Sequence, residues 1–131
     1  MHWYLKALKQ YFDFTGRARR SEYWYFVLFN FIFFIVAAAF DAFYGYFLEI
    51  PDWETTWEFF YPLYALLTFI PALAVTVRRL HDTGHSGWWY FILLMPILGA
   101  IWLLVMLLQD SESKDNKWGP SPKQTKWRSR L

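Results

Sequence analysis

The sequence contains no cysteine, which excludes disulfide bonds, thiolate metal sites and a cysteine nucleophile. It has no large excess of either charge, because 13 lysines and arginines stand against 11 aspartates and glutamates. A formal net charge of +2 gives no indication of nucleic-acid binding. A glycine-rich phosphate loop and a combination of serine, histidine and carboxylate suited to catalysis are also missing. We therefore predict no catalytic residues and no cofactor.

Charge is absent from three long stretches of the chain. Residues 23–40 are uncharged and remain apolar beyond Asp41 to residue 48, and residues 59–77 and 88–108 are two further such runs. A helix needs about 20 residues to cross a hydrocarbon core about 30 Å thick. Hydrophobic residues make up 56% of the chain, more than a globule of 131 residues can bury. The sequence predicts an all-α integral membrane protein with three hydrophobic membrane helices.

The third hydrophobic run has an uncertain path, because Pro96 and Gly99 fall near its middle. Proline removes a helical hydrogen bond and bends or breaks a helix. The run 88–108 is therefore either a kinked third crossing or a re-entrant hairpin bent at Pro96 and Gly99. A hairpin would have arms of only about ten residues, so a full crossing is the preferred interpretation.

The two ends of the chain differ from this hydrophobic middle. Residues 2–14 have the spacing of an amphipathic helix, which would lie in the membrane interface or pack against the spans. Residues 109–131 are polar and predict a mostly disordered tail, with a turn at the sequence NKWGPSP as the piece suited to docking. These features predict a single helical membrane domain over residues 1–108.

Basic residues are retained on the cytoplasmic side of a membrane, so their distribution predicts orientation. Five lysines and arginines precede residue 23, whereas residues 49–58 contain none and hold four acidic residues. We expect a cytoplasmic N-terminus, an outer loop at 49–58 and a cytoplasmic loop at 78–87. The tail carries six basic residues, which a third crossing would place outside and a hairpin would place inside.

Two arginine-rich stretches, GRARRSE and RRLHD, should therefore meet at the cytoplasmic surface. Arginine offers a planar fork that binds a carboxylate or a phosphate through paired hydrogen bonds. The preferred interpretation is that Glu22 and Asp82 pair with these arginines and join the ends of two spans. The alternative is a site for a lipid phosphate or another anion. The predicted polar cluster comprises Arg17, Arg19, Arg20, Glu22, Arg78, Arg79, His81 and Asp82.

The remaining polar residues give weaker indications. His81 and His85 have helical metal-ligand spacing, but Gly84 interrupts the helix and a third ligand is not evident, so no metal site is predicted. Asn30 is expected to bond a neighbouring helix, and Asp41 to lie near the outer headgroups.

The blocks YFDFTGRARRSEYWYF and VRRLHDTGHSGWW, followed by NKWGP in the tail, resemble the bacterial inner-membrane proteins of the domain-of-unknown-function 805 family. The resemblance covers almost the whole chain and implies a multi-pass protein of the bacterial inner membrane. It implies no established activity.

These observations lead us to expect an accessory or structural membrane protein. An anion-binding, lipid-headgroup-binding or transport subunit is the alternative, and a metal-dependent membrane enzyme is less favoured. The expected partners are the lipid bilayer, and with it anionic lipids, other membrane proteins or further copies of the chain.

Overall fold

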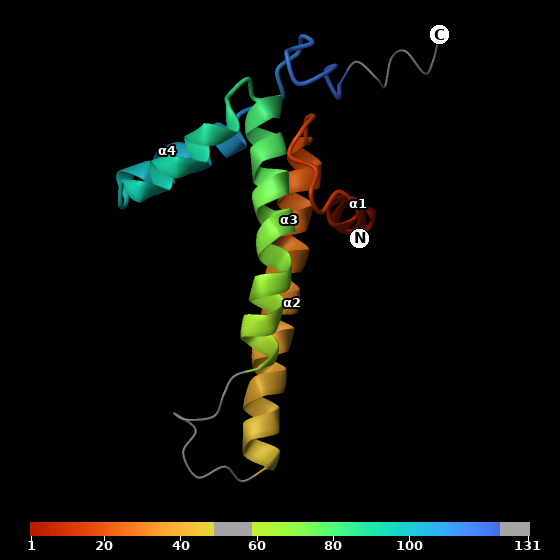
Figure 1. The fold of residues 1–131 in the computed structure, drawn as a ribbon, viewed down its shortest axis with the longest axis vertical. Helices are drawn as coiled ribbons and strands as arrows, with labels where there is room; N and C mark the ends of the chain where they lie inside the picture. The colour runs from red at the N-terminus through yellow and green to blue at the C-terminus, as the bar shows by residue number, and fades with distance from the viewer. Residues whose placement is uncertain (49–58, 124–131) are drawn as a thin grey trace.

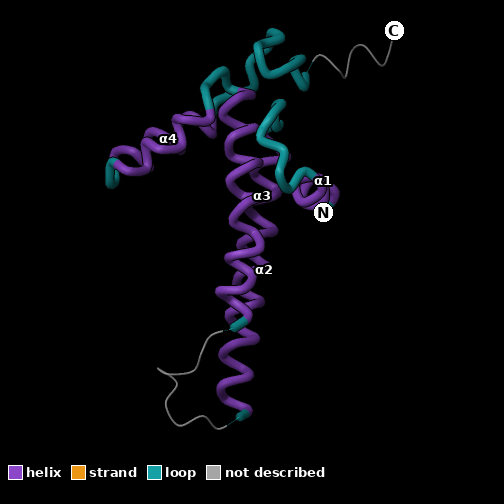
Figure 2. Tube along the Cα trace, in the orientation of Figure 1, coloured by secondary structure: helices purple, strands orange, loops and turns teal. Residues whose placement is uncertain are grey.

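The computed structural model describes residues 1–48 and 59–123, and each regular element in these residues is a helix. Figure 1 shows the long helices lying side by side, with a short helix against one flank and a helical hairpin projecting sideways from one end. Figure 2 shows the loops that connect these helices at that same end. In chain order the elements are α1 (His2–Lys9), α2 (Arg20–Phe47), α3 (Phe60–Asp82), the 3-10 helix η1 (Gly87–Leu94) and α4 (Leu98–Leu108).

The long pair α2 and α3 has the dimensions of membrane helices. They contain 28 and 23 residues. At 1.5 Å per residue this corresponds to about 42 and 35 Å, more than the hydrocarbon thickness of about 30 Å. Only 6% of the most apolar stretch of α2 is buried within the protein. Apolar surface with so little protein around it is favourable in contact with lipid and unfavourable in contact with water.

The two helices match the expected spans 23–48 and 59–77, with shifted ends. α2 begins at Arg20, and α3 continues to Asp82, so Arg78 to Asp82 form the last turn of the helix. This extension places the RRLHD side chains on a rigid element. The chain then turns at Gly84, whose positive φ of 80° suits glycine. The predicted outer loop at 49–58 lies outside the described residues.

The third hydrophobic run does not form one helix. η1 ends at Leu94 and α4 begins at Leu98, with Ile97 at a φ of +64° between them. The chain runs outward along η1 and back along α4 (Figure 1). A Cβ atom on Gly99 would overlap the carbonyl oxygen of Ile92, so only glycine permits this approach of the two arms. Two described helices, α2 and α3, have the length and composition for a crossing.

Helix α1 is shorter than the predicted 2–14 and packs on α2, which is one of the two arrangements expected for it. Tyr4 and Ala7 are buried. The Tyr4 ring contacts Phe26 and Phe33, with centroid distances of 5.4 and 5.3 Å. Aromatic contacts thus supply much of this small helix interface.

Polar side chains connect the helices within their apolar surroundings. The Tyr64 hydroxyl of α3 donates to Oδ1 of Asn30 in α2 at 2.8 Å and lies 3.2 Å from the Tyr4 hydroxyl of α1. The prediction that Asn30 bonds a neighbouring helix is confirmed. Asp41 of α2 accepts the backbone N–H groups of Phe59, Phe60 and Tyr61, and so caps the start of α3 from another helix.

The polar segment after α4 has no regular structure, but it is not free of the fold. Residues 109–123 lie against the end of α3 (Figures 1 and 2), although their composition predicts disorder. An isolated bridge between Asn116 and Gly119 forms the predicted turn. Residues 124–131 lie outside the described residues.

Candidate functional site

Asp82 lies at the centre of a buried polar cluster at the end of α3. Its Oδ1 accepts the Nε–H group of Arg17 at 3.0 Å, and its Oδ2 accepts Nη1 of Arg79 at 2.5 Å and the hydroxyl of Ser111. The three charged side chains are 0–2% exposed. Both carboxylate oxygens are therefore occupied, and Asp82 acts as an ion-pair partner.

A second ion pair joins α2 and α3 beside this centre. Nη2 of Arg78 lies 3.4 Å from Oε1 of Glu22, and both side chains are 1% exposed. The other oxygen of Glu22 accepts Nζ of Lys6 at 2.7 Å. Arg78 also donates to the backbone oxygens of Gln10 and Asp13, so this residue fastens the connection between α1 and α2 onto α3.

Arg79 holds the hairpin in place from its buried position. Its Nε–H group donates to the carbonyl oxygen of Leu107 at 3.1 Å, and its Nη2 donates to that of Gln109. The last carbonyl groups of a helix have no partner within the helix, and a guanidinium group is well suited to bind them. Arg79 therefore caps the end of α4.

Arg17 binds the C-terminal segment, residues 109–123, to the same cluster. Its Nη2 donates to the carbonyl oxygens of Glu112 at 2.6 Å and Asp82 at 3.2 Å. Its Nη1 donates to those of Lys114 at 2.9 Å and Gly119 at 3.4 Å. Only arginine has five N–H donors in a planar arrangement that serves this many acceptors.

His81 completes the contact with the C-terminal segment. Its ring stacks on Trp118 with centroids 4.5 Å apart and an interplanar angle of 8°. Its Nδ1 lies 3.1 Å from the carbonyl oxygen of Gly16, which can only accept, so Nδ1 carries the proton. The backbone oxygen of His81 accepts the side-chain amide of Asn116 at 3.0 Å.

The second histidine is engaged separately. Nδ1 of His85 lies 3.1 Å from the Thr83 hydroxyl, and its ring meets Trp89 edge to face. In residues 1–48 and 59–123, no three histidine, cysteine or acidic side chains are grouped so that they could hold a metal ion.

Two of the eight predicted cluster residues are placed apart from the buried centre. Arg19 donates to the carbonyl oxygen of Pro122, and Arg20 is exposed at the start of α2. The other six come together as described. The sequence analysis gave the NKWGPSP turn, residues 116–122, as a piece suited to docking, but it did not connect Asn116, Trp118 and Ser121 of this turn, or Ser111, with the arginine cluster. A tryptophan beside Gly-Pro in an otherwise polar tail was the available signal.

Outside the membrane helices, two carboxyl groups have lowered pKa values. Partial burial raises the pKa of Asp13, but hydrogen bonds from Thr15 and the charge of Arg78 outweigh it and hold the pKa below its ordinary value. The hydrogen bond from Lys123 is the main cause that lowers the pKa of Asp110. Both groups stay ionised near neutral pH and serve as acceptors.

Taken together, these contacts describe a cluster whose charges are used inside the protein. Arg17, Arg78 and Arg79 direct their donors at backbone carbonyls and at Glu22 and Asp82. The arrangement can join chain segments and order the tail. It presents no exposed nucleophile or open oxyanion site among the groups named.

A family model described as "Protein of unknown function (DUF805)" matches residues 11–120. The chain is 42% identical over 123 residues to the inner membrane protein YhaH of Escherichia coli K12, covering 94% of this chain and 98% of that protein. It is also 42% identical over 123 residues to the inner membrane protein YhaI of the same strain, covering 94% and 97%. No solved structure matches the chain.

These similarities agree with the apolar surfaces of α2 and α3, and they identify a membrane protein. Residues 11–120, which the family model matches, include the arginine-rich stretches, the hairpin and the docked turn at Asn116. The chain therefore belongs to the DUF805 family of membrane proteins, whose function is unknown.

Proposed function

We propose that the protein is an accessory or structural component of the inner membrane, in which the polar cluster fastens three chain segments to the end of the α2–α3 pair. The observation that supports this function is the internal pairing of Arg17, Arg78 and Arg79, whose side chains are at most 2% exposed. Charges this deeply buried destabilise a protein unless they are paired. Their pairing here supports a role in holding the protein together.

We further propose that α2 and α3 are the two crossings and that both ends of the chain lie in the cytoplasm. The bonds from Arg17 to Glu112 and Lys114 tie the C-terminal segment to the end of the helices where the N-terminal segment lies. The basic residues of both segments would then lie on the side that retains them.

In this arrangement the η1–α4 hairpin enters the membrane from the cytoplasmic side without crossing it. α4 has 11 residues, or about 17 Å, which is too short to cross a hydrocarbon core of about 30 Å. The hairpin tip is apolar, with Leu94 81% and Ile97 77% exposed, and this composition suits lipid. Non-helical backbone inside the membrane must be covered by protein, and the two arms of the hairpin cover each other.

A fusion experiment tests the proposed topology. Reporters that are active only in the cytoplasm or only in the periplasm are attached after residue 131. We expect signal from the cytoplasmic reporter alone. Signal from the periplasmic reporter alone would contradict the proposal.

A matched pair of variants tests the proposed structural role. Arg79→Ala removes one partner of a buried network, which typically costs about 3–5 kcal/mol. We expect Arg79→Ala to lower the yield of monodisperse protein in detergent, whereas Lys9→Ala at an exposed position of α1 leaves the yield unchanged. A normal yield of folded Arg79→Ala protein would contradict the structural role.

A further inference from the structure

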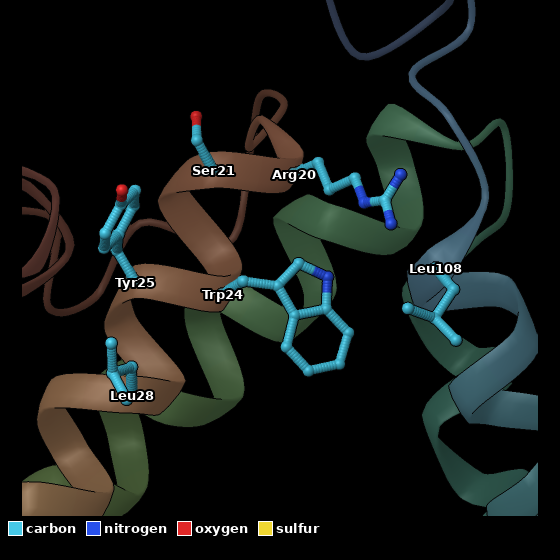
Figure 3. A pocket seen from close by; sticks show the side chains of 6 residues that line it. All are labelled: Arg20, Ser21, Trp24, Tyr25, Leu28 and Leu108. Atoms are coloured by element: carbon cyan, nitrogen blue, oxygen red, sulfur yellow. The ribbon is translucent and has the colours of Figure 1, made fainter.

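A groove lies between the start of α2 and the end of α4, beside the polar cluster. It has a volume of about 540 Å³. Figure 3 shows Arg20 and Trp24 extending from α2 towards Leu108 of α4. The lining residues are Arg20, Ser21, Trp24, Tyr25, Leu28 and Leu108. The groove thus combines one cationic group with apolar and aromatic walls.

Arg20 differs from the buried arginines, because it has no ion pair or hydrogen bond with any residue in 1–48 or 59–123. It is close enough to Arg79 for the two positive charges to repel each other. Trp24 also has an unused donor, since its shielded Nε1–H group has no acceptor among the residues described. This side of the groove therefore has spare positive charge, and Trp24 is one of the residues that line it.

We propose that this groove binds one anionic phospholipid, with the phosphate on Arg20 and the first part of an acyl chain along Trp24 and Leu28. The inference rests on the proposed position of this end of α2 at the cytoplasmic membrane surface. A guanidinium group binds a phosphate through two parallel hydrogen bonds. The cytoplasmic leaflet is also the one rich in anionic lipid.

The apolar walls favour a lipid over free phosphate. Sites for a small hydrated anion need several polar groups to replace its water, whereas Tyr25, Leu28 and Leu108 offer apolar surface. An acyl chain gains free energy on these walls in proportion to the area that it covers. A phospholipid matches both parts of the groove, and a free anion matches only Arg20.

Native mass spectrometry of the full chain in detergent tests this assignment. The wild type, Arg20→Gln, Arg20→Lys and Lys9→Gln are each titrated with phosphatidylglycerol and with phosphatidylcholine. Lys9→Gln is the matched control, since it removes an exposed positive charge of α1 away from the groove. We expect Arg20→Gln to weaken phosphatidylglycerol retention about tenfold. Arg20→Lys should lose less, and Lys9→Gln should match the wild type.

Three results would overturn the proposal: equal retention by Arg20→Gln and Lys9→Gln, equal retention of the two lipids by the wild type, or displacement of phosphatidylglycerol by millimolar inorganic phosphate. If Arg20→Gln aggregates, Leu108→Ser probes the apolar wall instead, and it should also weaken phosphatidylglycerol retention. Unchanged retention by Leu108→Ser would then count against the groove. Lipid retention in detergent does not depend on orientation, so a failure of the proposed topology would appear only in the reporter fusions.

Discussion

The hydroxyl group of Tyr11 donates a hydrogen bond of 2.5 Å to the carbonyl oxygen of Leu67. In a regular helix that carbonyl would accept the N–H group of the residue four positions later, which is Pro71 and has no N–H. Tyr11 therefore supplies the bond that proline removes from α3. In apolar surroundings an unsatisfied carbonyl would be costly.

Tyr11→Phe should destabilise the protein by about 1–3 kcal/mol, because it leaves the Leu67 carbonyl without a donor. The measurement is the apparent Tm in detergent, with Tyr46→Phe at an 85% exposed position as the control. The combination with Pro71→Ala is more specific, since alanine restores the helical N–H. In that background Tyr11→Phe should cost clearly less. An equal cost in both backgrounds would contradict the role of Tyr11.

Arg17→Lys should release the C-terminal segment even though the charge is kept. Lysine cannot serve the carbonyl oxygens of Glu112 and Lys114 together with Asp82. We expect chymotrypsin to cleave after Trp118 about tenfold faster, which corresponds to about 1.4 kcal/mol of lost docking free energy. Arg20→Lys is the control, because Arg20 has no bond to the described part of the segment, residues 109–123. A similar acceleration in both variants would refute the prediction.

Gly99→Ala should force the hairpin arms apart. The added Cβ atom would meet the backbone oxygen of Ile92, which cannot move as a flexible side chain can. We expect a loss of about 1–3 kcal/mol, as for other overpacked sites, visible as a lower apparent Tm and a lower folded yield. Ala100→Ser changes the neighbouring exposed position and should behave as the wild type. Wild-type stability of Gly99→Ala would mean that the two arms do not approach this closely.

The stability of Asp41 variants should follow the number of side-chain acceptors that they retain for the three N–H groups at the start of α3. Asp41→Asn keeps one side-chain oxygen, whereas Asp41→Leu keeps none. Loss of an N-terminal cap costs about 0.5–2 kcal/mol, so Asp41→Leu should be the less stable of the two. Detergent unfolding curves measure this order. Equal stability of all three proteins would show that other acceptors satisfy these N–H groups.

The membrane class of the fold could be predicted from the sequence, and so could the meeting of the two arginine-rich stretches. The two long helices follow from uncharged run length, and the pairing of arginines with Glu22 and Asp82 followed from their placement at span ends. The third run was harder, because Pro96 and Gly99 are compatible with either a kink or a hairpin. The close approach at Gly99 depends on which backbone atom of η1 lies opposite it in α4, and a sequence pattern does not specify that atom.

By itself, the sequence determined that the protein needs an apolar solvent and that its arginines gather at one end of the helices. Both are properties of local runs of residues, which hydropathy and charge report directly. Only the tertiary structure decided that Arg17 holds the C-terminal segment while Arg20 has no bonded partner among the described residues, 1–48 and 59–123. The backbone oxygens that Arg17 binds lie 95 to 102 residues away in the chain, apart from that of Asp82. A contact between residues so far apart depends on how the helices pack, which no local pattern encodes.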